Sequence, residues 1–276
     1  MEKSPTLYWL WLEDIEDTDR ERWTLSRYRE AARHLGQFNG AYLAESPLST
    51  DGWLASDWMR TWLRCLEQEG GMERVAAAVI SDSFIQQVIP HALMERLRRL
   101  WDKREVFLLA LDRLPRVLCH RDAFPANLFL RRMPDGREKM VAIDWAFVGV
   151  GPIGEDLAPL VAVRAPAEMG LIGAPQLEKV VFERYVYGLR ETGWEGDVRL
   201  VRLGYAASVA LRYGCLTAGV VLLRALDPAT RAVMEERRTQ PIREILEQEV
   251  KLFTYALDLA DEAEGLILEE CTDVSG

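Results

Sequence analysis

The stretch CHRDAFPANLFL, residues 119–130, sets a basic residue beside an acid and follows them with a proline, an asparagine and an apolar run. Asp122 and Asn127 are five residues apart, and Pro125 lies between them. The apolar run that starts at Leu128 is typical of a β-strand, and the polar, proline-containing part before it is typical of a loop. We therefore predict that Asp122 lies in a loop that leads directly into a strand.

A β-hairpin is predicted immediately after this loop. The segments NLFLRR (127–132) and EKMVAID (138–144) flank the sequence MPDG. Pro134 presets its own φ angle and Gly136 permits a positive one, which is the chemistry of a turn. The two segments should therefore pair as antiparallel strands.

The register of the hairpin is predicted from the position of its turn. Residues that face each other across an antiparallel pair have a constant sum of residue numbers, and pairing Asn127 with Asp144 places the midpoint between Asp135 and Gly136, inside the turn. Directly opposed residues have Cα atoms about 4.5–5.5 Å apart. The amide of Asn127 and the carboxylate of Asp144 are therefore expected side by side at the open end of the hairpin, with Asp122 near them.

These three oxygen-bearing side chains suit the transfer of a phosphoryl group. Amide and carboxylate oxygens with room for water are ligands that Mg²⁺ prefers, and Mg²⁺ usually shares its coordination shell with substrate phosphates. A separate aspartate that does not bind the metal can accept a hydroxyl proton while phosphate is transferred. Taken alone, Asp122 could cap a turn and Asn127 could begin a strand. Their joint spacing favours the functional interpretation.

Most of the remaining chain is predicted to be helical. In residues 25–43 the apolar side chains follow steps of three and four residues, which is the period of a helix. Similar patterns fill residues 90–111, 176–189, 198–226 and 229–259. No repeat, low-complexity segment or Gly/Ser-rich linker divides the chain. We predict a mainly α fold with a small central β-hairpin (α+β), in a single domain over residues 1–276.

The apolar run at residues 203–223 is about as long as a membrane-spanning helix. Arg212 lies at its middle, and a lone charge there would be expensive in lipid. The helical patterns on either side carry ordinary solvated charges. We therefore predict a buried core helix and no membrane partner.

The composition is that of an ordinary globular protein. The 276 residues include 34 Lys and Arg against 44 Asp and Glu, a net charge of -10. The negative electrostatic field of such a chain repels a nucleic-acid backbone, so a neutral or cationic small molecule is the better-fitting partner. The cysteines, at positions 65, 119, 215 and 271, are too far apart for a metal-binding pair. Reduced thiols and an N-terminus unlike a signal peptide predict a cytoplasmic protein.

The motifs around the loop resemble a known enzyme family. The HRD triplet at 120–122, Asn127 five places after its aspartate, and AIDW at 142–145 are similar to the catalytic loop and metal-binding aspartate of the protein-kinase-like superfamily. The following GPIGEDLAPL at 151–160 resembles the aminoglycoside phosphotransferase and choline kinase branch. Trp-Ala stands where a protein kinase has Phe-Gly after the metal aspartate, and this departure fits the small-molecule branch.

The resemblance implies a role for each polar residue. Asp122 would be the catalytic base, and Asn127 and Asp144 would bind Mg²⁺. Asp156 would brace the backbone of the catalytic loop, as an acid near a helix N-terminus does in any fold. His120 is expected to be a packed scaffold of the loop and not a proton carrier. The implied reaction is ATP-dependent phosphorylation of a hydroxyl group on a small molecule, by the C-terminal lobe of a kinase-like fold.

The N-terminal segment departs from the family pattern. A complete kinase-like enzyme has, before its catalytic loop, a β-rich lobe with a glycine-rich loop and a lysine that pairs with the nucleotide phosphates. Here Lys3 is the only lysine before Lys103. The sequence LYWLWLEDI (7–15) resembles only the last strand and the hinge of that lobe. The residues expected to meet an adenine are Glu13, Asp14 and Ile15.

Two interpretations of this departure stay open. The chain is either a truncated form of a longer enzyme or a half-kinase that holds ATP poorly. The alternative function, from a different class, is a non-catalytic binding or regulatory module that has lost the ATP-binding half.

A competing motif lies at residues 149–154, where GVGPIG matches the G-x-G-x-x-G pattern of dinucleotide-binding folds. The strand predicted before it is the second arm of a hairpin, and Pro152 lacks a backbone donor that the phosphates would use. No clear second strand follows. We therefore favour the phosphotransferase interpretation.

The sequence does not name a substrate. The acids between residues 13 and 19 usually form a solvated face, although in the resembled branch amine-bearing substrates often meet an acidic cleft. Trp53, Trp58 and Trp62 have helical spacing and are expected to pack, with stacking on a ligand as the alternative.

Overall fold

The computed structural model describes residues 13–15, 23–44, 53–162 and 174–273. The helices are α1 (Leu25–Ala44), α2 (Trp58–Gln68), α3 (Gly71–Ser81), α4 (Ser83–Val88), α5 (His91–Asp102), α6 (Arg104–Arg113), α7 (Leu157–Ala162), α9 (Ala174–Glu191), α10 (Val198–Val209), the π-helical segment η2 (Ala210–Thr217), α11 (Ala218–Leu226), α12 (Pro228–Arg238) and α13 (Ile242–Asp273). The strands are β1 (Arg116–Cys119), β2 (Leu128–Arg132), β3 (Glu138–Ala142) and β4 (Gly149–Pro152), and the 3₁₀ turn η1 (Pro125–Asn127) precedes β2. Within these ranges the prediction of a mainly α fold is confirmed. The assignment to a kinase-like lobe stays a prediction.

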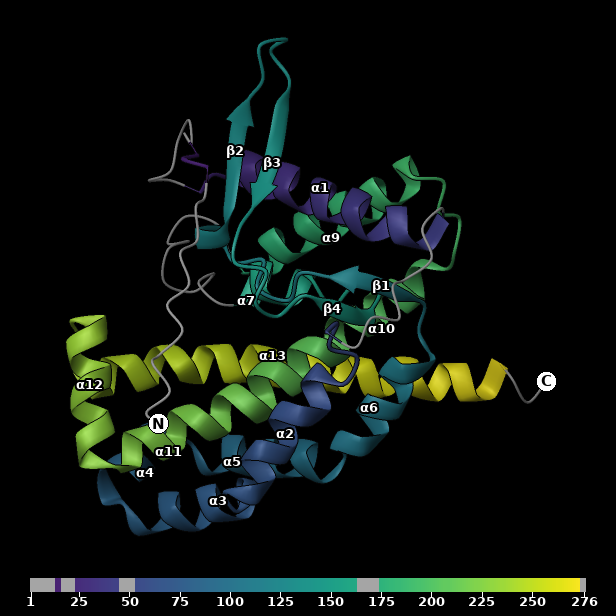
Figure 1. Ribbon diagram of the computed structural model, residues 1–276. Coiled ribbons are helices and arrows are strands. Elements are labelled where there is room, and N and C mark those ends of the chain that lie inside the picture. Colours follow the sequence, from purple (N-terminus) through teal and green to yellow (C-terminus); the bar gives the residue numbers. More distant parts are fainter. Residues whose placement is uncertain (1–12, 16–22, 45–52, 163–173, 274–276) are drawn as a thin grey trace, which may run out of the picture.

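The helices lie on two sides of the short strands β1 and β4 (Figure 1). Helices α1 and α9 lie together on one side, beside the projecting hairpin of β2 and β3. Helices α2 to α6 and α11 to α13 lie on the other side. The chain between β1 and β2 therefore runs where the two helical groups meet.

Helix α1 packs tightly against α9 because glycines remove side chains where the two helices cross. A Cβ atom on Gly36 would lie 2.1 Å from the carbonyl oxygen of Tyr185, and one on Gly188 would lie 2.1 Å from the carbonyl oxygen of Arg33. A carbon atom cannot approach a backbone oxygen that closely. The two helix backbones therefore approach each other at a distance that only glycine permits.

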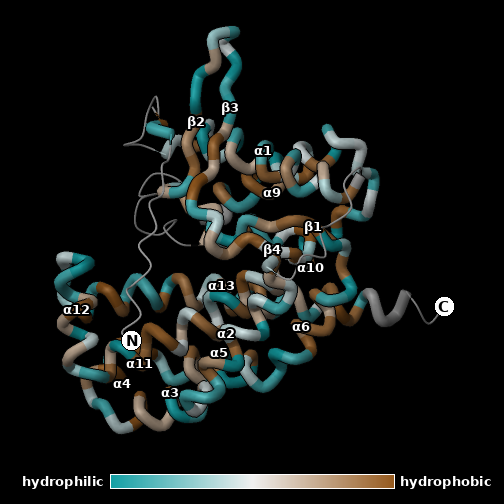
Figure 2. Tube along the Cα trace, viewed as in Figure 1, coloured by the Kyte–Doolittle hydropathy of each residue, from teal (hydrophilic) through white to brown (hydrophobic). Residues whose placement is uncertain are grey.

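The long apolar segment forms one span of α10, η2 and α11. By length and composition Val198–Leu226 is able to cross a membrane, but 67% of its most apolar 18-residue window is buried inside the protein. The span packs against α13, α2 and α5, and Figure 2 shows hydrophobic residues gathered where these helices meet. Such burial is what a core helix requires.

The predicted hairpin is present, but its predicted register is wrong by one residue. Leu128 pairs with Ala142, so Asn127 faces Ile143 and not Asp144. The N–H of Ile143 donates to the carbonyl oxygen of Asn127 over 3.0 Å. Asn127 also lies outside the strand, because it ends the 3₁₀ turn η1.

The shift has its origin in the turn. The connection is a five-residue loop, in which the N–H of Met133 donates to the Arg137 carbonyl (2.8 Å) and the N–H of Gly136 donates to the Met133 carbonyl (2.9 Å). The centre of the hairpin therefore falls on Asp135 itself. The prediction placed it half a residue later because it started from the pairing of Asn127 with Asp144 and required only that the midpoint fall inside the turn.

A second two-stranded sheet, which was not predicted, joins β1 to β4. Because Cys119 pairs with Gly149, most of the GVGPIG sequence is a strand and not a loop between a strand and a helix. Its glycines permit close packing instead. A Cβ atom on Gly149 would lie 2.1 Å from the Ala55 carbonyl oxygen, and one on Gly151 would lie 1.9 Å from a carboxylate oxygen of Glu155.

Two of the predicted helices are each divided. Residues 90–111 fall in α5 and α6, which Lys103 separates. Residues 229–259 fall in α12 and α13, where Thr239 ends the first helix with a left-handed φ of 53° and Pro241 follows. Pro241 is a signal in the sequence that would have predicted the second break.

One continuous cluster of buried hydrophobic side chains extends from Tyr28 to Ala263. Val117 and Cys119 of β1 and Ala123 of the following loop belong to it, and all three are 0% exposed. The loop after β1 therefore rests directly on a close-packed core, which limits its movement.

Candidate active site

Asp156 holds the backbone that immediately precedes Asp122. Its Oδ2 accepts hydrogen bonds from the N–H of His120 and from the side-chain amide of Asn39, each over 3.0 Å, and its Oδ1 accepts from the N–H of Arg121 over 2.7 Å. The carboxylate is fully buried, so these hydrogen bonds are charge-assisted and shielded from water. Asn39 comes from α1 and was not predicted, because no signal in its local sequence marks it.

His120 joins the loop to the end of the hairpin. Its Nε2 lies 2.9 Å from the Ile143 carbonyl oxygen, and its Nδ1 lies 3.1 Å from the N–H of Asp122. A carbonyl only accepts and a backbone N–H only donates, so the neutral ring carries its proton on Nε2. The ring is fully buried and packs against Trp145, with ring centroids 4.4 Å apart. His120 therefore links the loop to the hairpin, and among the described residues it has no contact that would relay a proton to solvent.

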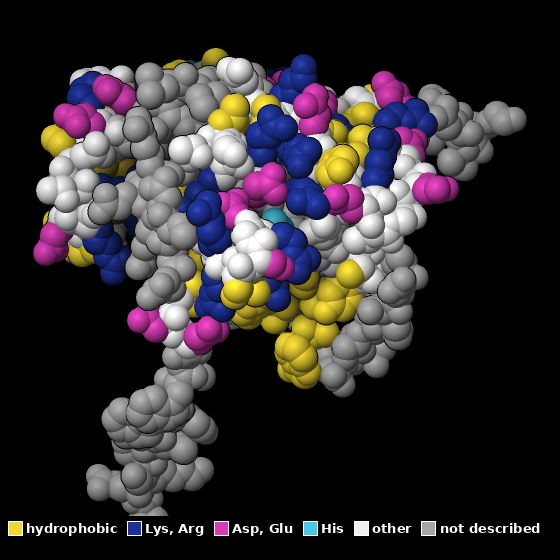
Figure 3. Space-filling view, turned by 90° about the horizontal axis from the view of Figure 1, so that it is seen from above, with side chains coloured by type: hydrophobic (Ala, Val, Ile, Leu, Met, Phe, Trp, Pro, Cys, Tyr) yellow, Lys and Arg dark blue, Asp and Glu magenta, His cyan; other side chains and the backbone are white. Residues whose placement is uncertain are grey.

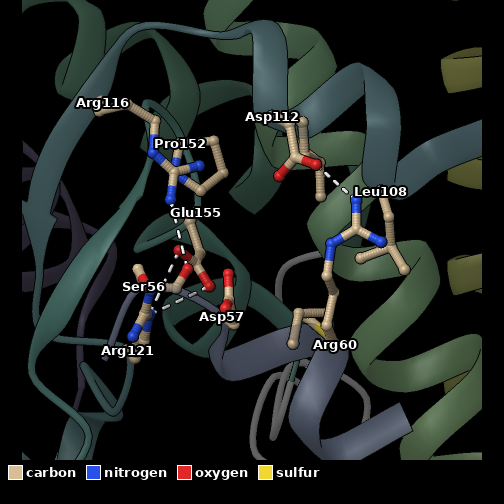
Figure 4. Close-up of a pocket in the computed structure, with 11 residues that line it drawn as sticks. Ser56, Asp57, Arg60, Leu108, Asp112, Arg116, Arg121, Pro152 and Glu155 are labelled. Carbon is tan, nitrogen blue, oxygen red and sulfur yellow. Dashed lines mark hydrogen bonds and ion pairs between the residues drawn. The ribbon is translucent and has the colours of Figure 1, made fainter. Parts of the chain in front are cut away.

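Arg121 turns into the interior behind the loop. Its φ of 65° is left-handed, and its guanidinium donates to the carbonyls of Ala55 (2.9 Å) and Val150 (2.8 Å). It also forms a buried ion pair with Glu155 at 3.4 Å, which Figure 4 shows from the side of a small pocket. In the same view Arg60 reaches Asp112 across the pocket. Among the described residues, Glu155 is thus the acid that balances the charge of Arg121.

Asn127 fixes one oxygen of the Asp122 carboxylate. The Nδ2 of Asn127 donates to Asp122 Oδ2 over 3.0 Å and to the Asp122 carbonyl over 2.9 Å. Because both acceptors lack protons, the amide must present its nitrogen to Asp122. Its oxygen is left for another ligand.

Burial raises the pKa of Asp122, whose side chain is 15% exposed. Arg212 acts in the opposite direction and lowers this pKa, while the charge of Asp144 raises it further. The hydrogen bond from Asn127 also lowers it. Asp122 is therefore a partly buried carboxylate that faces one cation and one other acid.

Asp144 follows the hairpin in a strained backbone conformation. Its φ is 60°, and among the described residues the only other non-glycine residues with positive φ are Arg121 and Thr239. Arg121 immediately precedes the predicted base Asp122, and Asp144 is itself a predicted metal ligand. Such strain costs of the order of 1–3 kcal/mol per residue and concentrates at functional sites.

The donor set fits a small hard cation. The Asn127 oxygen and the exposed Asp144 carboxylate are hard ligands, and the mutual repulsion of Asp122 and Asp144 would be relieved by a bound cation. Among the described residues no three His, Cys, Asp or Glu side chains gather as a metal site. The protein would thus supply few ligands, which is usual for Mg²⁺ that is bound together with phosphates.

Arg212, like Asn39, was not predicted as part of this site. Its guanidinium donates to the Arg121 carbonyl and lies 3.6 Å from Asp122 Oδ1. It projects from the π-helical segment η2, in the middle of the apolar span. The signal was present in the sequence as a single charge within a buried helix, which needs a partner, but the identity of that partner was not.

Aromatic side chains line the region beside the loop. Trp58, Trp62 and Phe147 form an edge-to-face cluster with ring centroids 6.0, 6.2 and 6.4 Å apart. Trp58 is buried, and Trp62 is 40% exposed. Trp53 lies before the start of α2 and is 69% exposed, so the prediction that these tryptophans pack is wrong for Trp53.

The residues expected to meet an adenine lie partly within the described ranges. Glu13 is exposed and forms an ion pair with Arg131 of β2 at 2.9 Å, which places it beside the hairpin. Asp14 is also exposed, and Ile15 is half-buried. The predicted strand at residues 7–12 and the acids at residues 16–19 lie outside the described residues. A role for Glu13, Asp14 and Ile15 in nucleotide binding stays a prediction.

Figure 3 shows the face from which the hairpin projects. Basic and acidic side chains are interspersed over the centre of this face, and hydrophobic side chains gather along one edge. A ligand that approaches here meets both signs of charge, although the net charge of the chain is -10.

Comparison with models of protein families matches residues 3–177 to the phosphotransferase enzyme family, APH. The matched range is more than half of the chain and includes Asp122, Asn127, Asp144 and Asp156. Arg212 lies beyond it. No curated protein and no solved structure matches the chain.

Proposed function

Because the chain belongs to the phosphotransferase enzyme family, we propose that it transfers the γ-phosphoryl group of ATP to a hydroxyl group of a small molecule. The observation that carries this proposal is the state of the Asp122 carboxylate. One oxygen is held by Asn127, and the other accepts no hydrogen bond from the described residues. A carboxylate with one fixed oxygen and one open oxygen is suited to receive a proton.

Asp122 would accept the hydroxyl proton as the oxygen of the alcohol attacks the phosphorus atom. The open atom is Oδ1, and burial raises the pKa of this carboxylate, which makes it a stronger base than an exposed aspartate. Asp156 and His120 keep the loop in place through backbone hydrogen bonds. Positioning and electrostatics supply most of the catalysis in this chemistry, so a rigid loop supports the assignment.

Asn127 and Asp144 would hold Mg²⁺ through the amide oxygen and the carboxylate. When bound, the metal supplies positive charge next to the phosphates of the nucleotide. The left-handed backbone at Asp144 supports this role, because strain is kept where a side chain must point in a particular direction. Glu13, Asp14 and Ile15 would meet the adenine beside the hairpin.

Polar groups next to Arg212 support a polar acceptor substrate. The Tyr213 hydroxyl and the Trp58 indole N–H are both buried, and neither has a hydrogen-bond partner among the described residues. Burial raises the pKa of Tyr213 to about 12, so its hydroxyl remains a donor at neutral pH. Buried donors without partners are uncommon in folded proteins, and a bound polar ligand is one way in which they are satisfied. Hydroxylated small molecules, amine-bearing ones included, are the proposed substrates.

The test is phosphate transfer from radiolabelled ATP, with Mg²⁺, to a panel of sugars, amino sugars, amino alcohols and nucleosides. Asp122→Asn should lower kcat by about 10²–10⁴-fold, because it removes the base and changes little else in shape. Asp135→Asn makes the same chemical change at the exposed hairpin turn and should leave kcat unaltered. Equal rates for the wild type and Asp122→Asn would show that transfer does not depend on this site.

A second candidate is the non-catalytic binding or regulatory module. In the same experiment, calorimetric binding of a panel member or of ATP·Mg without any transfer would support the module. Transfer that depends on Asp122 would reject it.

A further inference from the structure

Arg212 is a charged residue at a place that is otherwise apolar. Its neighbours in the chain, Leu211 and Tyr213, are buried, and its own side chain is 12% exposed. A guanidinium in such surroundings is strongly unfavourable unless it has hydrogen-bond partners. Within the part of the chain that the structure describes, the polar partners of its guanidinium both lie on the catalytic loop: the Arg121 carbonyl and the Asp122 carboxylate at 3.6 Å.

Aromatic rings hold the guanidinium in one position. Its central carbon lies 5.0 Å from the ring centroid of Trp58, 5.3 Å from that of Phe124 and 5.7 Å from that of Tyr213. These rings come from α2, from the catalytic loop and from η2 itself. Cation–π contacts on a shielded guanidinium each contribute favourably and restrict its rotamers.

The backbone that carries Arg212 is also unusual. Residues 210–217 are π-helical, a conformation that is rare and concentrates at functional sites. The hydroxyl of Thr217 donates to the Arg212 carbonyl over 2.8 Å, which adds a side-chain hydrogen bond to the turn that carries Arg212. The helix therefore departs from α geometry at the residue that reaches the loop.

We propose that Arg212 is a positioning residue that orients the Asp122 carboxylate for proton acceptance, an inference that rests on the phosphotransferase function proposed above. Asn127 fixes Oδ2 through a hydrogen bond. The Arg212 guanidinium lies 3.6 Å from Oδ1 and attracts the carboxylate as an ion pair without a hydrogen bond, so Oδ1 is oriented and still able to accept a proton. Arg212 also binds the carbonyl of Arg121, the residue with left-handed backbone that immediately precedes the base. One guanidinium thus braces both the side chain and the backbone of the loop.

A lysine would not replace this arrangement fully. The guanidinium is a planar fork that reaches two acceptors in a fixed geometry, whereas an ammonium is a single point charge on a flexible chain. Arg212→Lys should keep the positive charge and lose the geometry. It therefore separates the contribution of charge from that of orientation.

The kinetic experiment compares Arg212→Met and Arg212→Lys with the wild type in ATP-dependent phosphate transfer. Arg212→Met should lower kcat by about 10²-fold, the effect expected when a catalytic group is misplaced by about 1 Å, with KM for both substrates changed by less than about threefold. The kcat of Arg212→Lys should lie between that of the wild type and that of Arg212→Met. The matched control is Arg202→Lys, because Arg202 lies on α10, pairs with Glu178 and Glu262 away from the loop, and should keep wild-type kcat.

A double-mutant cycle tests whether Arg212 acts through Asp122. In the Asp122→Asn background, Arg212→Met should cause little further loss of kcat, since there is no longer a carboxylate to orient. The proposal would be overturned if the fold-losses of kcat in the two single variants multiply in the double variant, or if Arg212→Met keeps the wild-type kcat. A rise in KM without a fall in kcat would also overturn it, because that result describes substrate binding.

The same four proteins are unfolded in urea, so that the inference can be judged without activity. If the wild type transfers no phosphate, the proposed function fails, and the urea midpoints decide the positioning inference alone. If the urea midpoint of the double variant shifts by an amount that differs from the sum of the shifts in the two single variants, Arg212 pairs directly with Asp122. Additive shifts would overturn it.

Discussion

Replacement of Asp156 by asparagine should lower the stability of the protein more than any comparable change at the surface. The carboxylate accepts from the N–H groups of His120 and Arg121 and from the amide of Asn39. Asparagine has nearly the same shape but one acceptor atom and one donor group. In either orientation its NH₂ group must face at least one buried donor.

The magnitude follows from the less damaging of the two orientations. When the amide oxygen replaces Oδ2, it keeps the contacts with His120 and Asn39, and the NH₂ group faces only the N–H of Arg121. That orientation loses one hydrogen bond to a charged acceptor, about 1.5–3 kcal/mol, and leaves a buried N–H unsatisfied for about 1–3 kcal/mol more. We expect a loss of about 3 kcal/mol, which corresponds to a fall in Tm of roughly 6–12 °C for a chain of this size.

The assay is equilibrium unfolding in urea, followed by tryptophan fluorescence and by circular dichroism. Asp197→Asn is the matched control, because Asp197 caps α10 at an exposed position and asparagine is an equally good cap. The control should remain within about 0.5 kcal/mol of the wild type. If Asp156→Asn were as stable as the control, the hydrogen bonds of Asp156 would not be what holds the loop.

Three further predictions concern other parts of the molecule. Gly188→Ala should destabilise the protein by about 1–3 kcal/mol in urea unfolding, because its new methyl group meets backbone, whereas Gly265→Ala, in a helix with no atom within 4 Å, should stabilise it by about 0.5–1 kcal/mol. Glu249→Met should raise the urea midpoint at pH 7, since Glu249 is buried with one unpaired oxygen and its partner Arg238 is half exposed. Burial raises the pKa of Glu249 in the folded protein, so the charged carboxylate lowers stability at neutral pH and the protonated form does not. The gain from Glu249→Met should therefore shrink as the pH falls toward the ordinary pKa of glutamate, and a constant gain would contradict the reasoning. Asp144→Asn should weaken calorimetric binding of Mg²⁺·ATP while leaving Tm nearly unchanged, and unaltered binding would remove this exposed residue from the metal site.

The parts of the site that were predicted correctly from the sequence depend on residues close together in the chain. The hairpin follows from the φ preferences of Pro134 and Gly136 and from two flanking segments that favour strands. The helices follow from apolar side chains repeated at the helical period. The neighbourhood of Asp122 and Asn127 follows from their separation of five residues within one loop. Such features need no knowledge of the rest of the fold.

The register of the hairpin shows where local reasoning ends. The register shifts by one residue according to whether the Arg137 carbonyl accepts from the N–H of Met133 and closes the turn. That hydrogen bond depends on how β2 pairs with β3 and on how β2 packs on the core. Period-two alternation is weak over strands of five residues, so the sequence pattern alone accepts either register. The 3₁₀ turn at Asn127 and the left-handed backbone at Asp144 then place both side chains at the open end of the hairpin.

Only the tertiary structure decided which distant residues complete the site. Arg212 is 91 residues from the Arg121 carbonyl to which it donates, and Asn39 is 117 residues from Asp156. The sequence shows that a buried arginine or asparagine needs a partner, because burial without one is unfavourable. It does not show which partner, because that choice depends on how α1 and η2 pack against the loop, and packing is decided by the shapes of all the surfaces together.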